Sequence, residues 1–445
     1  MRLAILGGGG FRVPLVHGAL LRDRSPGRVT EVVLHDTDAG RLAAVALVLE
    51  QLAAGHPDPP QVVTTADLDT ALRGADFVFS AIRVGGLVGR TRDERVALDL
   101  GVLGQETTGP GGLAYALRTV PVALDIAERA HRLAPEAWFI NFTNPAGIVT
   151  EAMQSVLGER VVGICDSPTA LVRRAIHALG LDPAATEVDY VGLNHLGWLR
   201  ALRVDGVDHL PRLLADPTSL VRLEEGRLFG PEWLQTLGSL PNEYLYYYYF
   251  TREAVASILG SGQTRGEFLL EQQSAFYDAV EHHPQDAAAQ WRRVREERDA
   301  TYLREARADG EERDEEDVAG GGYEGVALAI MAAISRGEPS TMVLNVRNGT
   351  AVPGLPADAV VEVPCTVDGT GAHPLALPPV EGHQLGLMQQ VKAVERAVIE
   401  AASTGSADAA LRAFALHPLV DSVSTARRLL AGYRAASPAV DALLS

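Results

Sequence analysis

The fold class of this chain is decided by the stretch Leu3-Ala-Ile-Leu-Gly-Gly-Gly-Gly-Phe-Arg-Val-Pro-Leu-Val-His-Gly-Ala-Leu-Leu21. Its apolar start predicts a short buried strand over residues 3–6, and its second half predicts a helix over residues 11–21. A glycine-rich turn from a strand into a helix brings backbone amides close to a pyrophosphate at the helix N-terminus. The N-terminus therefore predicts a dinucleotide-binding α/β unit.

The residues around this turn are candidates for cofactor binding. A second strand, predicted over residues 29–35, ends at Asp36. A carboxylate in that place accepts hydrogen bonds from the ribose 2′-hydroxyl, which favours NAD over NADP. Arg12 stands where the usual fingerprint has its third glycine, so the match to the fingerprint is incomplete. The predicted cofactor-binding residues are Gly7, Gly8, Gly9, Gly10, Phe11 and Asp36.

Further strands and helices alternate through the first third of the chain. A helix is predicted between the second and third strands, over residues 39–52. Short apolar strands separated by helices are typical of a doubly wound parallel sheet of the Rossmann type. The later predicted strands cover residues 61–64, 76–80, 138–141 and 161–164.

Two domains are expected from the length and from this pattern. Residues 1–166 are predicted to form a Rossmann-like NAD-binding domain. Residues 167–445 are predicted to form a mostly helical α+β domain for substrate binding, metal binding and oligomerisation. The polar segment 306–322, which contains the charge run 311–317, is predicted to be a solvated loop and not a site.

Composition limits the classes of protein and of partner. The chain of 445 residues has a formal net charge of −18, which argues against nucleic acid or an anionic membrane surface as a partner. Its two cysteines cannot form a disulfide framework, and no apolar run reaches the roughly 18–20 residues that span a bilayer. Lys392 is the single lysine, and it lies far from the motifs, which argues against Schiff-base chemistry. We expect a soluble cytoplasmic enzyme.

A second informative region is Val161-Val-Gly-Ile-Cys-Asp-Ser-Pro168, followed by Val191-Gly-Leu-Asn-His-Leu-Gly-Trp198. Cys165 follows a predicted strand, at the edge of the sheet where ligands bind in such folds. A thiolate and the imidazole of His195 converging on one point suit a divalent transition metal. Each residue also has a structural explanation, because a buried cysteine is a small hydrophobe and His195 is flanked by turn residues. Three roles are open for Asp166: a further ligand, an acid, or a turn former.

Longer strings elsewhere in the chain point to a known family. They are Ile82-Arg-Val-Gly-Gly-Leu87, Gly101-Val-Leu-Gly-Gln-Glu-Thr-Thr-Gly-Pro-Gly-Gly112, Ile140-Asn-Phe-Thr-Asn-Pro-Ala146, Asn345-Val-Arg-Asn348, Val361-Glu-Val-Pro-Cys365 and His417-Pro-Leu419. Together with the glycine turn and the two motifs above, these strings resemble glycoside hydrolase family 4, the NAD- and manganese-dependent glycosidases. Within that family the chain is most similar to the 6-phospho-β-glucosidases, and the resemblance covers essentially its whole length.

The resemblance implies a redox route to hydrolysis, outside the usual scheme with two carboxylates. NAD⁺ takes a hydride from C3 of the sugar, the resulting ketone acidifies the C2 proton, and a base removes that proton. The aglycone leaves, water adds and the hydride returns, so the cycle has no net redox change. By the family pattern, Cys165 and His195 bind Mn²⁺ together with sugar O2 and O3. The base resembles Tyr244 in Asn242-Glu-Tyr244, where Glu243 replaces the family's proline. The alternative for Tyr244 is an aromatic helix face packed in the core.

The substrate that the resemblance implies is a phosphorylated glucoside or disaccharide. Arg83 and Arg265 are the predicted phosphate ligands, because guanidinium groups bind phosphate oxygens bidentately. Asn144 is predicted to bind sugar hydroxyls, with a simple turn before a proline as the alternative. Gln105 and Glu106 either support the metal and C3 region or cap a helix.

Asp166 bears on which anomer is cleaved. Phospho-β-glucosidases of the family commonly carry Asn after the cysteine, whereas phospho-α-glucosidases commonly carry Asp as an acid for the leaving group. The strings 83–87 and 105–108, in contrast, resemble the β-type sequences. We expect a 6-phospho-β-glucosidase in which Asp166 is the general acid or holds sugar hydroxyls. The alternatives are a 6-phospho-α-glucosidase or an α-galactosidase of the same family.

Two other classes of protein stay open. An NAD-dependent 2-hydroxyacid dehydrogenase would use the same kind of fold, but the arginine and histidine arrangement of that group is missing. A catalytically dead sensor of NAD and sugar phosphate is disfavoured by the retained Cys165, His195 and Tyr244. The habit of the resembled family leads us to expect a homodimer or a homotetramer.

Overall fold

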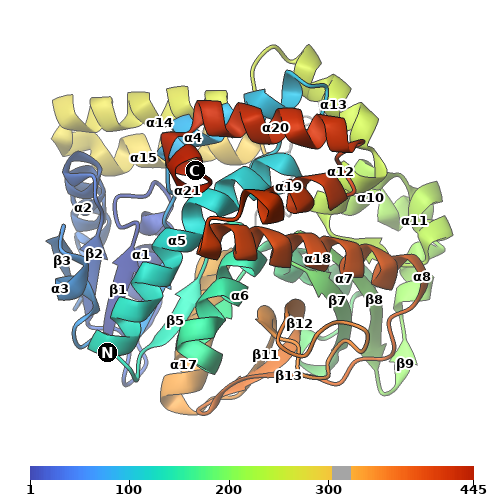
Figure 1. Cartoon of the computed structure of the whole chain (residues 1–445). Helices are drawn as coiled ribbons and strands as arrows, with labels where there is room; N and C mark the ends of the chain where they lie inside the picture. The colour runs from blue at the N-terminus through green and yellow to red at the C-terminus, as the bar shows by residue number, and fades with distance from the viewer. Residues whose placement is uncertain (303–321) are drawn as a thin grey trace.

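The chain folds around one continuous mixed β-sheet, and the computed structural model describes residues 1–302 and 322–445 (Figure 1). One half of the sheet is parallel, with the strand order β6-β5-β4-β1-β2-β3. Each of these strands is short, and helices connect them, so the predicted doubly wound parallel sheet is confirmed. Their bounds are β1 Arg2–Leu6, β2 Glu31–His35, β3 Gln61–Thr65, β4 Phe77–Ser80, β5 Trp138–Asn141 and β6 Val161–Gly163.

The first helix begins two residues later than the sequence predicts. Helix α1 spans Val13–Arg22, because Gly10 to Arg12 complete the turn and Pro14 favours the first turn of a helix. Helix α2, at Ala39–Ala53, starts where predicted, since the Asp38 side chain accepts a hydrogen bond from the Arg41 amide. The other helices of this half are α3 Leu68–Leu72, α4 Gly86–Leu98, α5 Pro110–Leu133, α6 Ala146–Leu157 and α7 Ser167–Leu179.

The other half of the sheet is antiparallel, and the sequence patterns did not predict its strands. Strand β11 joins the two halves, because it pairs with β6 through Asn345 and Gly163. Strand β12 carries six consecutive buried residues, so it lacks the alternation that reveals a half-exposed strand. The additional strands are β7 Glu187–Leu193, β8 Leu196–Val204, β9 Val207–Asp208, β10 Leu240–Pro241, β11 Ser340–Arg347, β12 Val360–Asp368 and β13 Gly371–Pro374.

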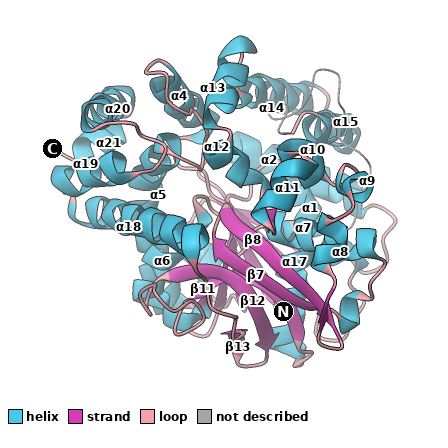
Figure 2. Cartoon of the chain, turned by 90° about the vertical axis from the view of Figure 1, so that its right-hand side faces the viewer, coloured by secondary structure: helices cyan, strands magenta, loops and turns pink. Residues whose placement is uncertain are grey.

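Helices surround the sheet (Figure 2). The C-terminal helices pack on α4, α5 and α6 through a core of small and branched apolar residues. Helices α14 and α15 pair with each other and lie against α4 and α2, respectively, while α17 packs on α1. These six helices are α14 Arg265–His282, α15 Ala287–Ala300, α17 Tyr323–Arg336, α18 Gly382–Thr404, α19 Ala407–Leu416 and α20 Val423–Ala436.

Short helices fill the connection between the antiparallel hairpin and α14. They are α8 Leu210–Leu214, α9 Pro217–Leu220, α10 Glu224–Phe229, α11 Pro231–Leu237, α12 Tyr246–Tyr249 and α13 Thr251–Gly260, and a last helix, α21, spans Pro438–Leu443. The predicted solvated loop with its charge run lies outside the described residues, except for Gly322. Within the two described ranges, no helix combines the length and apolar character that crossing a membrane requires.

Candidate active site

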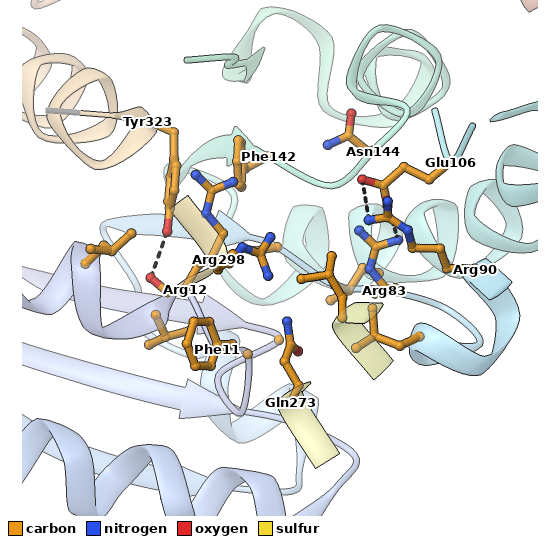
Figure 3. A pocket seen from close by; sticks show the side chains of 18 of the residues that line it. Phe11, Arg12, Arg83, Arg90, Glu106, Phe142, Asn144, Gln273, Arg298 and Tyr323 are labelled. Atoms are coloured by element: carbon orange, nitrogen blue, oxygen red, sulfur yellow. Dashed lines mark hydrogen bonds and ion pairs between the residues drawn. The ribbon is translucent and has the colours of Figure 1, made fainter. Parts of the chain in front are cut away.

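A cavity of about 2700 Å³ lies at the carboxyl ends of the parallel strands. Its wall starts at the glycine turn after β1 and continues past the loops after β4, β5 and β6. Residues of α14 and α15 line the opposite side, and Figure 3 shows side chains from these elements converging on the space between them. Ligands of open α/β sheets bind at this edge, so the fold places the candidate residues where a ligand is expected.

Backbone hydrogen bonds fix the conformation of the glycine turn, and neighbouring atoms lie so close to it that side chains would not fit. The amides of Gly7 and Gly8 donate to His35 O at 3.0 and 2.7 Å, and Gly7 has a φ of 81°. A Cβ on Gly7 would lie 2.7 Å from Ala81 O, so only glycine fits there. Gly7, Gly9 and Gly10 line the cavity, whereas Gly8 faces Leu34 of β2.

Asp36 and Phe11 support this turn from two sides. Asp36 Oδ2 accepts a hydrogen bond from the Gly9 amide at 2.9 Å, and Oδ1 accepts one from Asp38 N at 3.0 Å. Asp36 also lines the cavity, and an ionised carboxylate has further lone pairs for a ribose hydroxyl. The Phe11 ring is buried edge-on against Phe276, with centroids 5.2 Å apart, so Phe11 shapes the turn mainly through packing. A turn without side chains at the N-terminus of a helix, with a carboxylate beside it, fits a dinucleotide.

The two predicted metal ligands lie on the same cavity wall. Cys165 follows β6, and His195 occupies the tight turn between β7 and β8 with a φ of 62°. Burial raises the pKa of the Cys165 thiol, and the neighbouring Glu362 and Asp166 add to this rise. Burial lowers the pKa of His195 to about 4, so its imidazole is neutral and able to bind a metal.

The side chains of Cys165 and His195 fit a metal site in which oxygens of a substrate or of water supply the remaining ligands. In the described ranges, no group of three or more His, Cys, Asp or Glu side chains could hold a metal ion. Cys165 and His195 therefore provide two protein donors, and open positions are left for oxygens of a substrate or of water. Asn144 also lines the cavity (Figure 3), and its buried Oδ1 has no hydrogen-bond partner. An unpartnered buried oxygen of this kind is costly unless a ligand satisfies it.

Tyr244 lies directly against His195. The two rings stack with centroids 3.7 Å apart and an interplanar angle of 8°. Of the neighbouring tyrosines, Tyr246 is buried in the core and does not line the cavity, whereas Tyr247 is buried and does line it. Tyr244 itself lines the cavity. Tyr302, which the sequence patterns did not single out, places its hydroxyl 3.2 Å from the Tyr244 hydroxyl.

Asp166 is paired with the residue that departs from the glycine fingerprint. Arg12 Nη2 lies 3.1 Å from Asp166 Oδ2. The Arg12 guanidinium also lies over the Tyr323 ring at 4.5 Å, and the Tyr323 hydroxyl donates to Arg12 O at 2.7 Å (Figure 3). Burial lowers the pKa of Arg12, but Tyr323 and Asp166 outweigh burial and leave it raised. Arg12 therefore connects the glycine turn to the loop that carries Cys165.

Arginines dominate one part of the cavity wall (Figure 3). Glu106 bridges two of them, with Oε2 at 2.7 Å from Arg83 Nη1 and Oε1 at 2.8 Å from Arg90 Nη1. Burial raises the pKa of Glu106, but Arg83 and Arg90 outweigh this and lower it to about 2. The sequence left the role of Glu106 open, and the structure shows it as their shared counter-ion. Gln105 instead caps a turn, since its Oε1 accepts from the Thr107 amide at 2.6 Å.

Two further arginines complete this wall. Arg265 begins α14 and donates to Thr301 Oγ1 at 2.7 Å and to Arg298 O at 2.9 Å. Burial, together with the nearby Arg12 and Arg265, lowers the pKa of Arg298 to about 9. A site with this excess of positive charge is suited to an anion such as a phosphate. Arg90 and Arg298 were not found from the sequence, because an arginine-rich chain gives no signal for individual arginines.

Comparisons with known proteins show to which family the chain is similar. Residues 2–181 match a family model described as "Family 4 glycosyl hydrolase", and residues 190–420 match the model of the family's C-terminal domain. A probable 6-phospho-beta-glucosidase from Bacillus subtilis is 33% identical over 440 residues, which cover 97% of this chain and 95% of that protein.

Solved structures of two specificities resemble the whole chain. The 6-phospho-beta glucosidase from Thermotoga maritima, solved with NAD and glucose-6-phosphate, has a TM-score of 0.82, 26% identity and 98% coverage of both chains. A 6-phospho-alpha-glucosidase from gut microorganisms, solved with NAD and Mn²⁺, has a TM-score of 0.78, 25% identity and 97% coverage of both chains. The overall fold is therefore shared by enzymes that cleave opposite anomers.

Proposed function

The chain belongs to family 4 of the glycosyl hydrolases, and from this premise we propose that it hydrolyses 6-phospho-β-glucosides. Phosphorylated cellobiose and aryl glucoside 6-phosphates are substrates of this class. The proposal is carried by one cavity in which the glycine turn, Cys165 with His195, and several arginines meet. A dinucleotide, a metal and a sugar phosphate each need one of these three features.

The cofactors are NAD and a divalent metal such as Mn²⁺. When bound, NAD oxidises C3 of the sugar and later reverses that oxidation, while the metal places positive charge beside sugar O2 and O3. The glycine turn lets the pyrophosphate come close to the N-terminus of α1, and Asp36 accepts hydrogen bonds from the ribose hydroxyls. Cys165 and His195 hold the metal, and Asn144 Oδ1, which is buried without a partner, binds a sugar hydroxyl.

Tyr244 removes the proton from C2 of the sugar. The stacked His195 ring fixes the plane of the phenol next to the metal site. Asp166 uses one carboxylate oxygen for Arg12, which leaves the other oxygen for the leaving group or for sugar hydroxyls. Arg83 and Arg265 bind the 6-phosphate, and the bridge through Glu106 keeps the Arg83 guanidinium in place. Residues 1–166 thus bind the dinucleotide, and residues 167–445 contribute the base, the metal-binding histidine and Arg265.

Two observations bear on which anomer the enzyme cleaves, and they point in opposite directions. The 33% identity to a probable 6-phospho-beta-glucosidase favours the β anomer. Asp166 argues for the α anomer, because the family's α enzymes commonly carry an aspartate after the cysteine. Elimination across C1 and C2 expels either anomeric substituent, so the chemistry itself favours neither. A 6-phospho-α-glucosidase is therefore the second candidate, and an α-galactosidase of the family is the third.

One assay separates the candidates. Chromogenic β- and α-glucoside 6-phosphates are supplied with and without NAD⁺, Mn²⁺ and a reductant. We expect phenol release from the β substrate that requires NAD⁺ and Mn²⁺ and leaves no NADH. Faster release from the α substrate would reverse the anomer assignment. Steady accumulation of NADH would identify a dehydrogenase, and binding without turnover a sensor.

A further inference from the structure

Two contacts restrain the side chain of Tyr244 from different directions. The His195 ring covers its face at a centroid distance of 3.7 Å, and the Tyr302 hydroxyl lies 3.2 Å from its hydroxyl. The backbone is restrained as well, because Asn242 Oδ1 accepts from the Tyr244 amide at 3.0 Å. The face, the tip and the backbone of the tyrosine are thus each held by a different residue.

Tyr302 is in turn held by a buried carboxylate. Its hydroxyl donates to Glu243 Oε1 at 3.3 Å, and the Ser167 hydroxyl donates to the same oxygen at 2.6 Å. Glu243 is 4% exposed, and its Oε2 has no hydrogen-bond partner in the described ranges. A carboxylate oxygen that receives two hydroxyl groups fixes the direction of both.

Nothing else in the described surroundings explains a carboxylate at position 243. Burial, together with the neighbouring Glu224, raises the pKa of Glu243 to about 7. Arg174, a cation that lowers this pKa, is already engaged by Glu224 and Glu225. A buried carboxyl group in such a place lowers the stability of the fold, and a role in orienting other groups accounts for its presence. Glu243 is also the residue that departs from the family's motif.

We propose that Glu243 and Tyr302 are positioning residues, which together hold the Tyr244 hydroxyl in the orientation needed at C2 of the sugar. The inference rests on the proposed function, because it takes Tyr244 as the base. Glu243 Oε1 holds the Tyr302 hydroxyl in position. The Tyr302 hydroxyl in turn holds the Tyr244 hydroxyl in position. The three groups act in series, so the loss of either support has the same consequence for Tyr244.

The first test uses kinetics with a substrate deuterated at C2. For Tyr302→Phe we expect kcat to fall about tenfold, the value of one hydrogen bond. KM and the affinity for NAD⁺ stay unchanged, and the C2 isotope effect on kcat is at least as large as in the wild type. Glu243→Leu behaves like Tyr302→Phe, whereas Glu243→Gln, which keeps an acceptor oxygen, stays within about threefold of the wild type.

The double variant Tyr302→Phe/Glu243→Leu tests whether the residues act in series. Its kcat should equal that of the single variants, because both changes break the same chain of contacts. The matched control is Tyr249→Phe, which removes the acceptor of the Trp198 Nε1 hydrogen bond at 2.9 Å. Tyr249 does not line the cavity, so this control should keep the wild-type kcat. Multiplying defects in the double variant, or a smaller isotope effect in Tyr302→Phe, would overturn the proposal.

A second measurement does not depend on turnover. A 3-fluorotyrosine incorporated in place of Tyr244 reports the environment of its ring by fluorine NMR. We expect its resonance to shift or broaden in Tyr302→Phe and in Glu243→Leu, and to stay unchanged in Tyr249→Phe. An unchanged resonance in all three would overturn the positioning role even in an active enzyme. Absence of phenol release from the wild type would instead contradict the proposed function. The NMR result would then still show whether Tyr302 and Glu243 restrain the Tyr244 ring.

Discussion

Arg12 Nη2 lies 3.1 Å from Asp166 Oδ2, so an ion pair on the cavity wall joins the glycine turn to the loop that carries Cys165. Both side chains are partly exposed, at 39% and 33%. The pair therefore adds little to stability, and its effect should be on the geometry of the site. We expect Arg12 to orient the Asp166 carboxylate towards a substrate in the cavity when the dinucleotide is bound at the glycine turn.

Replacement of Arg12 by Gln should reveal this coupling. We expect kcat/KM to fall about tenfold, because Asp166 loses a charge-assisted hydrogen bond while the fold is retained. Steady-state kinetics and the thermal midpoint measure the two effects separately. Arg434→Gln removes a comparable ion pair, to Asp441 at 2.8 Å, away from the cavity and should leave kcat/KM unchanged. Equal losses in the two variants would contradict a role for Arg12 at the site.

The two cysteines provide a matched pair for the metal site. Cys165→Ser should lower metal-dependent turnover by a factor on the order of 100 or more, because serine is a poor ligand for a soft divalent metal. Cys365→Ser should keep most of the activity, since the Cys365 thiol donates only to Val363 O at 3.3 Å and lies outside the cavity. Activity and bound manganese are measured for both. Full activity of Cys165→Ser would remove Cys165 from the metal site.

The phosphate assignment can be tested by ligand-induced stabilisation. Glucose 6-phosphate should raise the thermal midpoint of the wild type more than glucose does. Arg265→Met should lose most of this difference, with affinity for the phosphate reduced by about tenfold. Arg95→Gln breaks the adjacent ion pair to Glu267, outside the cavity, and should keep the difference. A full response to glucose 6-phosphate in Arg265→Met would assign the phosphate to other arginines.

Glu362 should make the stability depend on pH. It is fully buried, accepts hydrogen bonds from Asn345 Nδ2 at 2.9 Å and Tyr190 Oη at 3.0 Å, and no cation of the described ranges contributes to its pKa shift. Burial raises its pKa from 4.5 to about 7. Its protonated form is therefore favoured in the folded state. The stabilisation that this provides is complete below pH 4.5 and is lost as the pH rises through about 7.

Glu362→Gln should remove this dependence. Between pH 5 and 7.5 the wild type should lose on the order of 3 kcal/mol relative to the variant. Thermal midpoints of both proteins across this range measure the difference. Glu338→Gln, at an exposed position beside Arg336, serves as the control for loss of a negative charge and should follow the wild type. Parallel pH profiles for the wild type and Glu362→Gln would contradict the raised pKa.

Local patterns determined the parallel half of the fold and the identity of the central site residues. The strands that precede Gly7 and Cys165 are short apolar runs that end in turns. Such runs can be predicted as strands from the local sequence alone. The antiparallel strands were missed because β12 is buried on both faces, so its sequence has no alternation. Cys165 and His195 could be proposed as site residues because each lies in a local motif, and Tyr244 because its segment resembles a family motif.

Tertiary structure alone decided how the charged and hydroxyl groups are paired. Arg12 meets Asp166, Glu106 bridges Arg83 and Arg90, and Tyr302 reaches Tyr244, although these partners are up to 154 positions apart. An arginine or a tyrosine looks the same in sequence whether it meets a carboxylate, a ring or water. Its partner depends on how distant helices pack at one edge of the sheet. A long side chain forms its ion pair or hydrogen bond with whichever group the fold brings within about 4 Å.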